Sequence, residues 1–98
     1  MNIQALLKQA QKMQADLKKV EQELEARVYE EENEFVRVEC DGKYHINTIE
    51  IKNKNLEDIE MLQDMIAVAV NKVIEKAKTE HEQELSKITG GVKMPGAF

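Results

Sequence analysis

Apolar residues in the first quarter of the chain recur at a spacing that alternates between three and four positions. This is the spacing of the a and d positions of a heptad repeat, and it places the residues along one narrow stripe of a helix. Because such a stripe must be covered, it predicts packing against a second helix of the chain, another subunit, or both. The residues of this stripe, here called the seam, are Ile3, Leu6, Ala10, Met13, Leu17, Val20 and Leu24.

The lysines of the same segment gather on the side of the helix that faces away from the seam. At about 100° per residue, they lie within roughly a third of a turn. They form what we call the lysine stripe: Lys8, Lys12, Lys18 and Lys19. On most helices such a stripe only faces solvent. Here it is unusual, because the chain has a net charge of -5 and its residues 21–41 hold nine acids against two arginines.

The length of 98 residues fits one small domain, near the size at which association between copies often supplements a single core. The longest apolar run, residues 65–70, is far shorter than the roughly 20 residues that span a bilayer, and the first turns lack the apolar block of a signal peptide. The single cysteine, Cys40, cannot form an internal disulfide. We therefore expect one domain over residues 1–90, a flexible tail over residues 91–98, and a cytoplasmic protein with no membrane partner.

The periodicity along the chain predicts an α+β fold with two long helices and a three-stranded antiparallel sheet. The first helix is expected to end at about Ala26. The second is expected to have Asn55 as its N-cap and to stop at Thr89-Gly90-Gly91. Its apolar face is broad up to Ala77 and thins beyond, so we expect its last turns to leave the core. The strands are predicted at residues 26–30, 35–40 and 43–52.

The alternation within the strands indicates which residues share a face of the sheet. Val36, Val38 and Cys40 are expected on one face. In the last strand, residues 45, 47, 49 and 51 are expected on one face and residues 44, 46 and 48 on the other. Asn33 predicts a turn between the first two strands. Asp41-Gly42 predicts a two-residue hairpin turn whose central residues both have positive φ.

Residues that could support catalysis or metal binding are sparse. Cys40 and His45 are the only pair that a nucleophilic mechanism could use, but they lie across the predicted turn and have no third group to orient the histidine. His45 and His81 lack the spacing of zinc ligands, and no glycine-rich loop follows a strand to hold phosphate. We therefore expect no enzyme activity, no metal, no cofactor and no small-molecule substrate.

Several segments, taken together in their order and spacing, carry a resemblance to a known family. They are residues 1–14, the strand–Asp41-Gly42–strand hairpin, residues 62–71, and the end of the chain with Thr89-Gly90-Gly91 and Met94-Pro95-Gly96. Over nearly its whole length the chain resembles the bacterial YbaB/EbfC family of nucleoid-associated DNA-binding proteins. Two segments depart from the family pattern. The acidic residues 30–34 stand where many relatives have a glycine-rich turn, and Lys52-Asn53-Lys54 stands where the family usually has Asp-Pro.

This resemblance implies an α-β-β-β-α protomer and a homodimer whose helices protrude like the arms of tweezers. It also implies binding of double-stranded DNA with little sequence preference. On this basis the lysine stripe is the main candidate for DNA contact, together with Lys87 and Lys93, which flank the helix stop at Gly90. The seam is then the dimer or packing surface. The acidic residues 30–34 argue against DNA contact by that loop.

A second interpretation belongs to a different class of protein. A helix–hairpin–helix module could bind other proteins through exposed apolar arm tips, as prefoldin subunits do, without any nucleic-acid role. Such arms need long coiled coils of matched length, whereas the second helix here loses its apolar face after Ala77. A scaffold that only oligomerises is a third interpretation. Salt separates these classes, because binding through lysine–phosphate contacts weakens steeply as salt rises.

Overall fold

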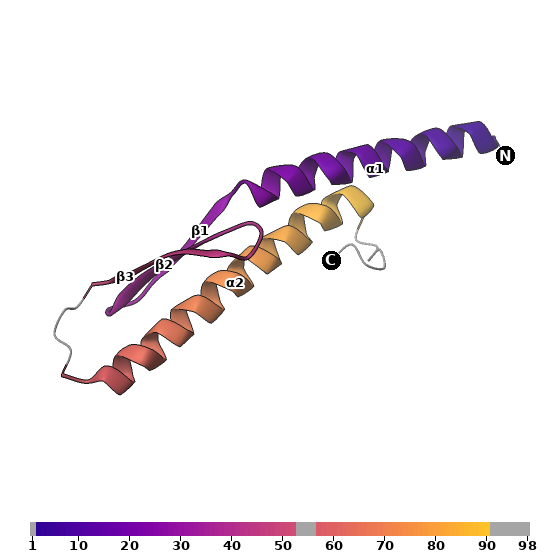
Figure 1. Ribbon diagram of the computed structural model, residues 1–98. Coiled ribbons are helices and arrows are strands. Elements are labelled where there is room, and N and C mark those ends of the chain that lie inside the picture. Colours follow the sequence, from indigo (N-terminus) through magenta and orange to yellow (C-terminus); the bar gives the residue numbers. More distant parts are fainter. Residues whose placement is uncertain (1, 53–56, 91–98) are drawn as a thin grey trace.

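The computed structural model describes residues 2–52 and 57–90 of the chain. Its elements follow one another as α1 (Ile3–Glu25), β1 (Val28–Glu32), β2 (Val36–Asp41), β3 (Ile46–Ile51) and α2 (Ile59–Thr89). The strands form one antiparallel sheet in the order β1-β2-β3 (Figure 1). The predicted α+β class and the α-β-β-β-α order are therefore confirmed. The predicted tail, residues 91–98, lies outside the described residues.

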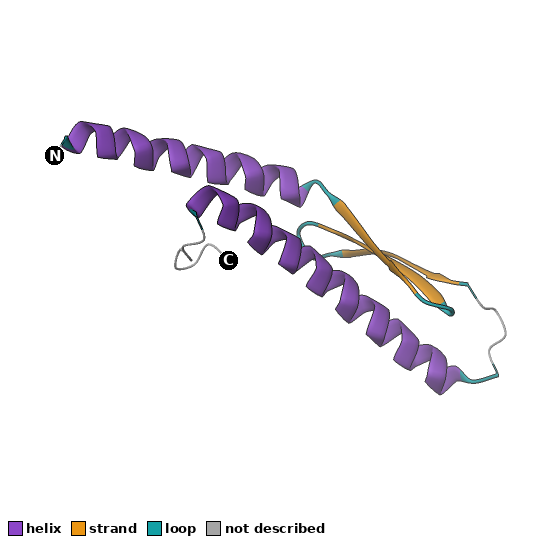
Figure 2. Ribbon diagram, turned by 180° about the vertical axis from the view of Figure 1, so that it is seen from behind, coloured by secondary structure: helices purple, strands orange, loops and turns teal. Residues whose placement is uncertain are grey.

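The protomer is elongated, with extents of 70 × 20 × 16 Å. Its radius of gyration is 18.9 Å, whereas a compact domain of about 100 residues has a radius of gyration of about 13 Å. The two helices run antiparallel, and α1 continues well beyond the end of α2 (Figures 1 and 2). We call the sheet with residues 59–77 of α2 the body, and α1 with the last turns of α2 the arm.

The body is held together by α2, which lies across one face of the sheet. Val36, Val38 and Cys40 of β2 are fully buried on this face, as their alternation predicted. They pack with Tyr29 of β1 and with small apolar residues of α2, namely Ala69, Val73 and Ala77. Because α2 packs mainly on β1 and β2, it covers little of β3, which forms one edge of the sheet.

The arm has a separate, smaller core made by the second half of the seam. Leu17 and Leu24 of α1 are buried against Leu85 of α2, and Val20 and Ile88 pack against this cluster. The last turns of α2 therefore leave the body core after Ala77, as expected, but they are buried in this second core. Leu85 and Ile88 lie three positions apart on one helix face, so together they meet the seam of α1. The chain thus covers the C-terminal half of its own seam.

The turn between β2 and β3 is longer than the predicted two-residue turn. β2 ends at Asp41 and β3 begins at Ile46. The Asp41 carboxylate accepts hydrogen bonds from the backbone N–H groups of Lys43 (2.8 Å) and His45 (3.1 Å). An aspartate that bonds its own backbone in this way favours a wider turn, and the positive φ falls on Tyr44 (66°) instead of on Asp41 and Gly42.

Gly42 is required for a steric reason instead of a conformational one. A Cβ atom at this position would lie 1.8 Å from the backbone oxygen of Leu24 and 2.7 Å from the Cα of Glu25. The β2–β3 turn therefore presses directly against the backbone at the end of α1. This contact joins the sheet to the root of the arm, the region where α1 leads into β1.

Both helices end where the sequence predicted, and only the N-cap of α2 differs from the predicted residue. α1 ends at Glu25, with Ala26 as its C-cap. α2 is capped by Asp58, whose carboxylate accepts a hydrogen bond from the backbone N–H of Met61 (3.0 Å). The predicted cap, Asn55, lies outside the described residues. Asp58 serves as the cap because it directly precedes the first helical residue, so its carboxylate can accept from the free N–H groups of the first turn.

The strands also differ in part from the predicted ones. The turn at Asn33 is confirmed, because its side-chain oxygen accepts from the backbone N–H groups of Phe35 (2.9 Å) and Val36 (3.0 Å). β1 begins at Val28 instead of residue 26. An irregularity in the register places Ile46 opposite Cys40, where it packs against the body core. Ile49 and Ile51 share a face as predicted, because they pair with Val38 and Val36. The prediction that Ile46 lies on the opposite face is wrong, since the bulge shifts the face of the residues before it.

Replacing Gly42 with alanine is expected to destabilise the protein by about 2–3 kcal/mol, because the new methyl group overlaps the backbone of α1 and the turn must move. Gly90→Ala is the matched control. Gly90 has a φ of 67° but open space where its Cβ would lie, so this substitution costs only the strain of the left-handed backbone, about 1 kcal/mol. Urea unfolding measures both losses. A Gly42→Ala loss no larger than that of Gly90→Ala would contradict the packing role of Gly42.

Candidate nucleic-acid interface

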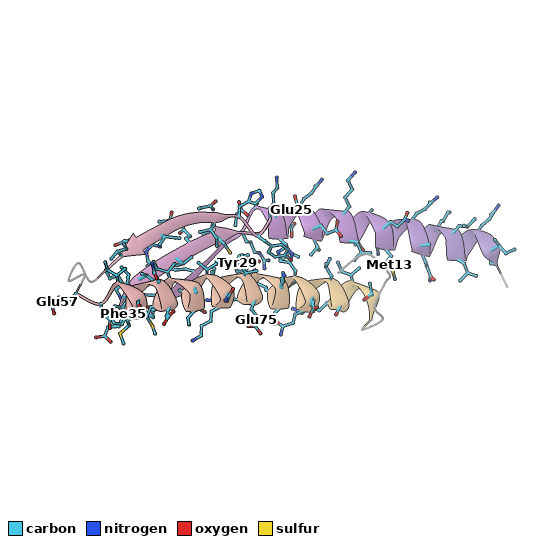
Figure 3. The ribbon with its side chains drawn as sticks, turned by 60° about the horizontal axis from the view of Figure 1, so that its bottom comes forward. Met13, Glu25, Tyr29, Phe35, Glu57 and Glu75 are labelled. Atoms are coloured by element: carbon cyan, nitrogen blue, oxygen red, sulfur yellow. The ribbon has the colours of Figure 1, made fainter. Side chains whose placement is uncertain are left out.

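The lysine stripe lies on the exposed side of the arm. Strong helix formers build α1, and Asn2 caps it by accepting hydrogen bonds from the backbone N–H groups of Gln4 (3.1 Å) and Ala5 (3.4 Å). The four lysines of the stripe are exposed. None of them forms an ion pair within the described part of the chain. Figure 3 shows side chains of α1 that project away from α2.

The dimensions of the stripe suit one side of a DNA duplex. From Lys8 to Lys19 it extends about 17 Å along the helix axis, at about 1.5 Å per residue. Since each strand of a duplex rises about 3.4 Å per base pair, this length corresponds to about five base pairs. Lysine ammonium groups bind phosphates as point charges, and phosphate contacts carry no direct information about base sequence.

The two further lysine candidates differ from the stripe. Lys87, in the last turns of α2, forms an ion pair with Glu84 at 3.2 Å. The pair forms because a glutamate three positions earlier lies on the same helix face. Lys93 lies outside the described residues. The structure thus gives a position for Lys87 on the arm but weakens its case as an open cation.

Several other cations of the chain are held by acidic groups. Lys76 of α2 reaches across to Glu31 of β1 at 3.7 Å. Further pairs are Lys52 with Glu32 and Arg27 with Glu80. The lysine stripe is therefore the largest group of lysines on one element that lacks acidic partners among the described residues.

The outer face of the sheet, opposite α2, is acidic. Arg37 of β2 lies among three carboxylates on neighbouring positions: Glu30 (3.5 Å), Glu39 (3.7 Å) and Glu50 (3.2 Å). Since one arginine cannot neutralise three carboxylates, this face stays negative. A negative face of this kind repels a polyanion, whereas the lysine stripe has no acidic partner among the described residues.

The first half of the seam extends beyond the end of α2. Met13 lies level with the last turns of α2, and α1 continues from there toward its N-terminus (Figure 3). Ile3 and Leu6, near that end, are 68% and 50% exposed. The tip of the arm therefore presents an apolar stripe on one side and lysines on the opposite side.

At the root of the arm, His81 of α2 lies between two tyrosines. Its Nδ1 atom is 3.1 Å from the hydroxyl oxygen of Tyr44, and its ring centroid is 6.2 Å from that of Tyr29. Burial lowers the pKa of His81, and the nearby carboxylates of Glu80 and Glu25 oppose this effect. The lowered pKa keeps the imidazole neutral near pH 7.

The residues considered for catalysis do not form a site. Cys40 is buried in the body core, and burial raises the pKa of its thiol, whereas a nucleophilic cysteine needs a lowered one. His45 is exposed in the turn and lies 3.8 Å from Asp41. In the described residues, no group of three or more potential ligands could hold a metal ion.

The described helices are also not membrane spans. Neither combines the length and the apolar character that crossing a bilayer requires.

The cluster around His81 is the feature that sequence reasoning missed. Its three rings come from β1, the β2–β3 turn and α2, so no local pattern connects them. The chain holds only two tyrosines, and both meet at this histidine. The small number of tyrosines can be seen in the sequence, but only the fold shows that both contact His81.

Comparison with known proteins yields one family across nearly the entire chain. The YbaB/EbfC DNA-binding family matches residues 1–92, a range that includes both the arm and the body. This is the family that the sequence resemblance indicated.

Several relatives are similar over at least nine tenths of their length. A nucleoid-associated protein of Pelotomaculum thermopropionicum is 43% identical over 101 residues, which cover 99% of this chain and 96% of that protein. One of Clostridium novyi is 43% identical over 108 residues, covering 100% of this chain and 90% of that protein. One of Acetivibrio thermocellus is 43% identical over 102 residues, covering 99% and 90%.

The surroundings of His81 predict how stability depends on pH. The pKa of His81 is lowered in the folded state, so as the pH falls below about 6.5, the usual histidine pKa, the unfolded chain takes up the proton first. The free energy of unfolding should therefore decrease between about pH 7 and pH 5, and His81→Gln should remove most of this decrease. Urea unfolding across this range is the measurement. The prediction is contradicted if, between about pH 7 and pH 5, the free energy of unfolding decreases by the same amount in the wild type and in His81→Gln.

Proposed function

The chain belongs to the YbaB/EbfC DNA-binding family, and on that premise we propose that it is a nucleoid-associated protein that binds double-stranded DNA as a homodimer. It has little sequence preference, and it resides in the bacterial nucleoid. It acts by binding and not by catalysis, so its effect is on the organisation or expression of the chromosome. The lysine stripe of α1 is the DNA-contacting surface.

The observation that carries this proposal is the separation of charge between the arm and the sheet. The stripe lysines are exposed and have no acidic partners among the described residues, whereas the outer face of the sheet is acidic. Each lysine that neutralises a phosphate releases condensed counterions, which supplies affinity without reading the bases. Little sequence preference follows from contacts of this kind.

The proposed dimer contact lies in the body. β3 is an edge strand, and its Ile49 and Ile51 are 47% and 39% exposed although they pair with buried residues of β2. The start of α2 lies at the same end of the body as the end of β3 (Figure 1). Its first turn includes the exposed apolar residues Ile59 and Met61. An uncovered edge with exposed isoleucines is a surface that monomeric proteins avoid, so a second copy is the simplest cover.

This arrangement changes the role proposed for the seam. Its C-terminal half packs on the chain's own α2, so we assign dimer formation to β3 and the start of α2. Two arms then extend from one joined body, in keeping with the tweezers that the resemblance implies. Because both arms carry a lysine stripe, the dimer offers twice the number of phosphate contacts of one protomer.

One observation favours a second candidate function. The apolar tip of the arm, with Ile3, Leu6 and Leu7 exposed, is the kind of surface that a protein-binding or chaperone-like module uses. Such binding would be insensitive to salt and indifferent to the lysines on the opposite side. The experiment on the lysine stripe therefore separates the two functions.

Reversing two charges of the stripe is expected to abolish duplex binding. Lys12→Glu with Lys19→Glu replaces two phosphate contacts by repulsion, and wild-type affinity should fall steeply with salt, by up to about 0.9 in the logarithmic slope for each phosphate contacted. Fluorescence anisotropy with a labelled duplex, measured across salt with a scrambled-sequence competitor, gives both quantities.

The matched control reverses two exposed lysines outside the stripe. Lys43→Glu with Lys72→Glu makes the same change in net charge and should leave most of the affinity intact. Equal losses in the two double variants would show a dependence on net charge alone. Wild-type binding that does not change with salt would overturn the lysine-stripe proposal.

Charging the edge strand is expected to separate the subunits. Ile49→Glu with Ile51→Glu places like charges on both sides of the proposed contact, so the protein should sediment as a monomer at micromolar concentration while the wild type sediments as a dimer. Leu6→Glu, in the exposed half of the seam, is the comparison and should leave the dimer intact. A dimer that dissociates in Leu6→Glu but persists in the edge variant would place the contact on the arms.

A further inference from the structure

Three rings from three elements meet at the root of the arm. Tyr29 comes from β1, Tyr44 from the β2–β3 turn and His81 from α2. The ring of His81 lies 5.2 Å from that of Tyr44 and 6.2 Å from that of Tyr29, measured between centroids. His81 therefore sits between the two tyrosines and contacts both the sheet and the turn.

Two polar atoms in this cluster are buried without a hydrogen-bond partner among the described residues. They are the hydroxyl of Tyr29, a residue only 4% exposed, and Nε2 of His81. Buried polar groups in proteins are nearly always paired, since leaving one unpaired forfeits its hydration. A neutral imidazole offers one donor and one acceptor, and a tyrosine hydroxyl can serve as either. His81 bonds Tyr44 through Nδ1, whereas its Nε2 and the hydroxyl of Tyr29 have no partner among the described residues and are held in place by the packing of the three rings.

Tyr44 is held in an unfavourable backbone conformation by its surroundings. Its φ is 66°, in the left-handed region that bulky residues avoid. The Asp41 carboxylate fixes the turn on both sides of it, and the Nζ atom of Lys78 lies 5.6 Å from its ring centroid. Strain of this kind persists only where neighbouring contacts maintain it, and it is concentrated at functional sites.

The same turn touches both helices of the arm. Gly42 lies against the backbone of Leu24 and Glu25 at the end of α1, while Tyr44 reaches His81 on α2. A change at either contact would alter the direction in which α1 leaves the sheet. Because the lysine stripe lies on α1, the direction of α1 also determines where the lysines lie relative to the sheet.

We propose that His81, bonded to Tyr44 and packed against the ring of Tyr29, is a positioning residue that fixes the direction of the arm relative to the sheet. The direction of the arm determines how many phosphates of a duplex the lysines can reach at once. His81 itself makes no contact with DNA. This inference rests on the proposed function, because it assumes that the lysine stripe binds a duplex.

The test compares His81→Leu and Tyr44→Phe, which remove the hydrogen bonds, with His81→Gln, whose amide has both a donor and an acceptor. Binding of a labelled duplex is measured across salt. His81→Leu and Tyr44→Phe should bind about tenfold more weakly, with a logarithmic salt slope smaller by about 1, because fewer phosphates are contacted together. His81→Gln should retain the wild-type slope. A variant that is only less stable has fewer active molecules but an unchanged slope.

A second readout follows the arm without DNA. Spin labels at Ala15→Cys on α1 and Glu34→Cys in the β1–β2 turn, in a Cys40→Ala background diluted with unlabelled protein, report the distance between arm and body. The distance distribution should broaden in His81→Leu and stay narrow in His81→Gln.

The outcomes separate the two proposals. If the wild type binds no duplex, the proposed function fails, while the spin labels still test whether His81 directs the arm. If the wild type binds and Lys12→Glu with Lys19→Glu does not, but His81→Leu keeps both the slope and the narrow distribution, the positioning role alone is overturned. It is equally overturned if His81→Gln behaves like His81→Leu.

Discussion

The packing of Leu17 and Leu24 on Leu85 is the contact on which the arm depends. Burying a leucine contributes about 2 kcal/mol, and these three residues form the buried apolar core of the arm among the described residues. The contact also fixes the rotation of α1 about its axis, since the seam must face α2. Because the lysines lie opposite the seam on the same helix, covering the leucines turns the lysines toward solvent. One apolar contact thus sets the electrostatics of the arm.

This geometry places the lysine stripe on one surface of the protein and the carboxylates around Arg37 on another. A net charge of -5 argues against DNA binding only if the charge is spread evenly. Here several carboxylates surround Arg37 on the outer face of the sheet, and α1 carries four exposed lysines without an ion pair among the described residues. Screening over about 8–10 Å at physiological salt makes each surface act nearly alone. The negative outer face of the sheet repels a polyanion and so favours its approach to the proposed DNA-contacting surface on the arm.

Periodicity predicted most of the fold, and tertiary contacts account for what it missed. The seam follows from an apolar repeat of 3.5 residues, and the buried face of β2 follows from an alternation of period two. The stop of α2 follows from the glycine at position 90. All three are local signals. The turn at Asp41 and the bulge before Ile49 were missed because a carboxylate and a register shift override alternation. The stripe was predictable from residue types and spacing, and so was the pair of Lys87 with Glu84. The grouping of Tyr29, Tyr44 and His81 was not, since it exists only after three elements have packed.

The two cores of the protomer do not share residues, and this has a consequence for how the molecule opens. The arm core is small and the body core is larger, so local unfolding of α1 can occur while the sheet stays closed. Cys40, the lone thiol, lies wholly within the body core. A thiol reagent therefore reaches it only when α2 lifts from the sheet, and its rate of modification reports the opening of the body alone. Amide hydrogen exchange in α1 reports the opening of the arm instead. The two measurements therefore follow the local unfolding of the arm and of the body separately in one molecule.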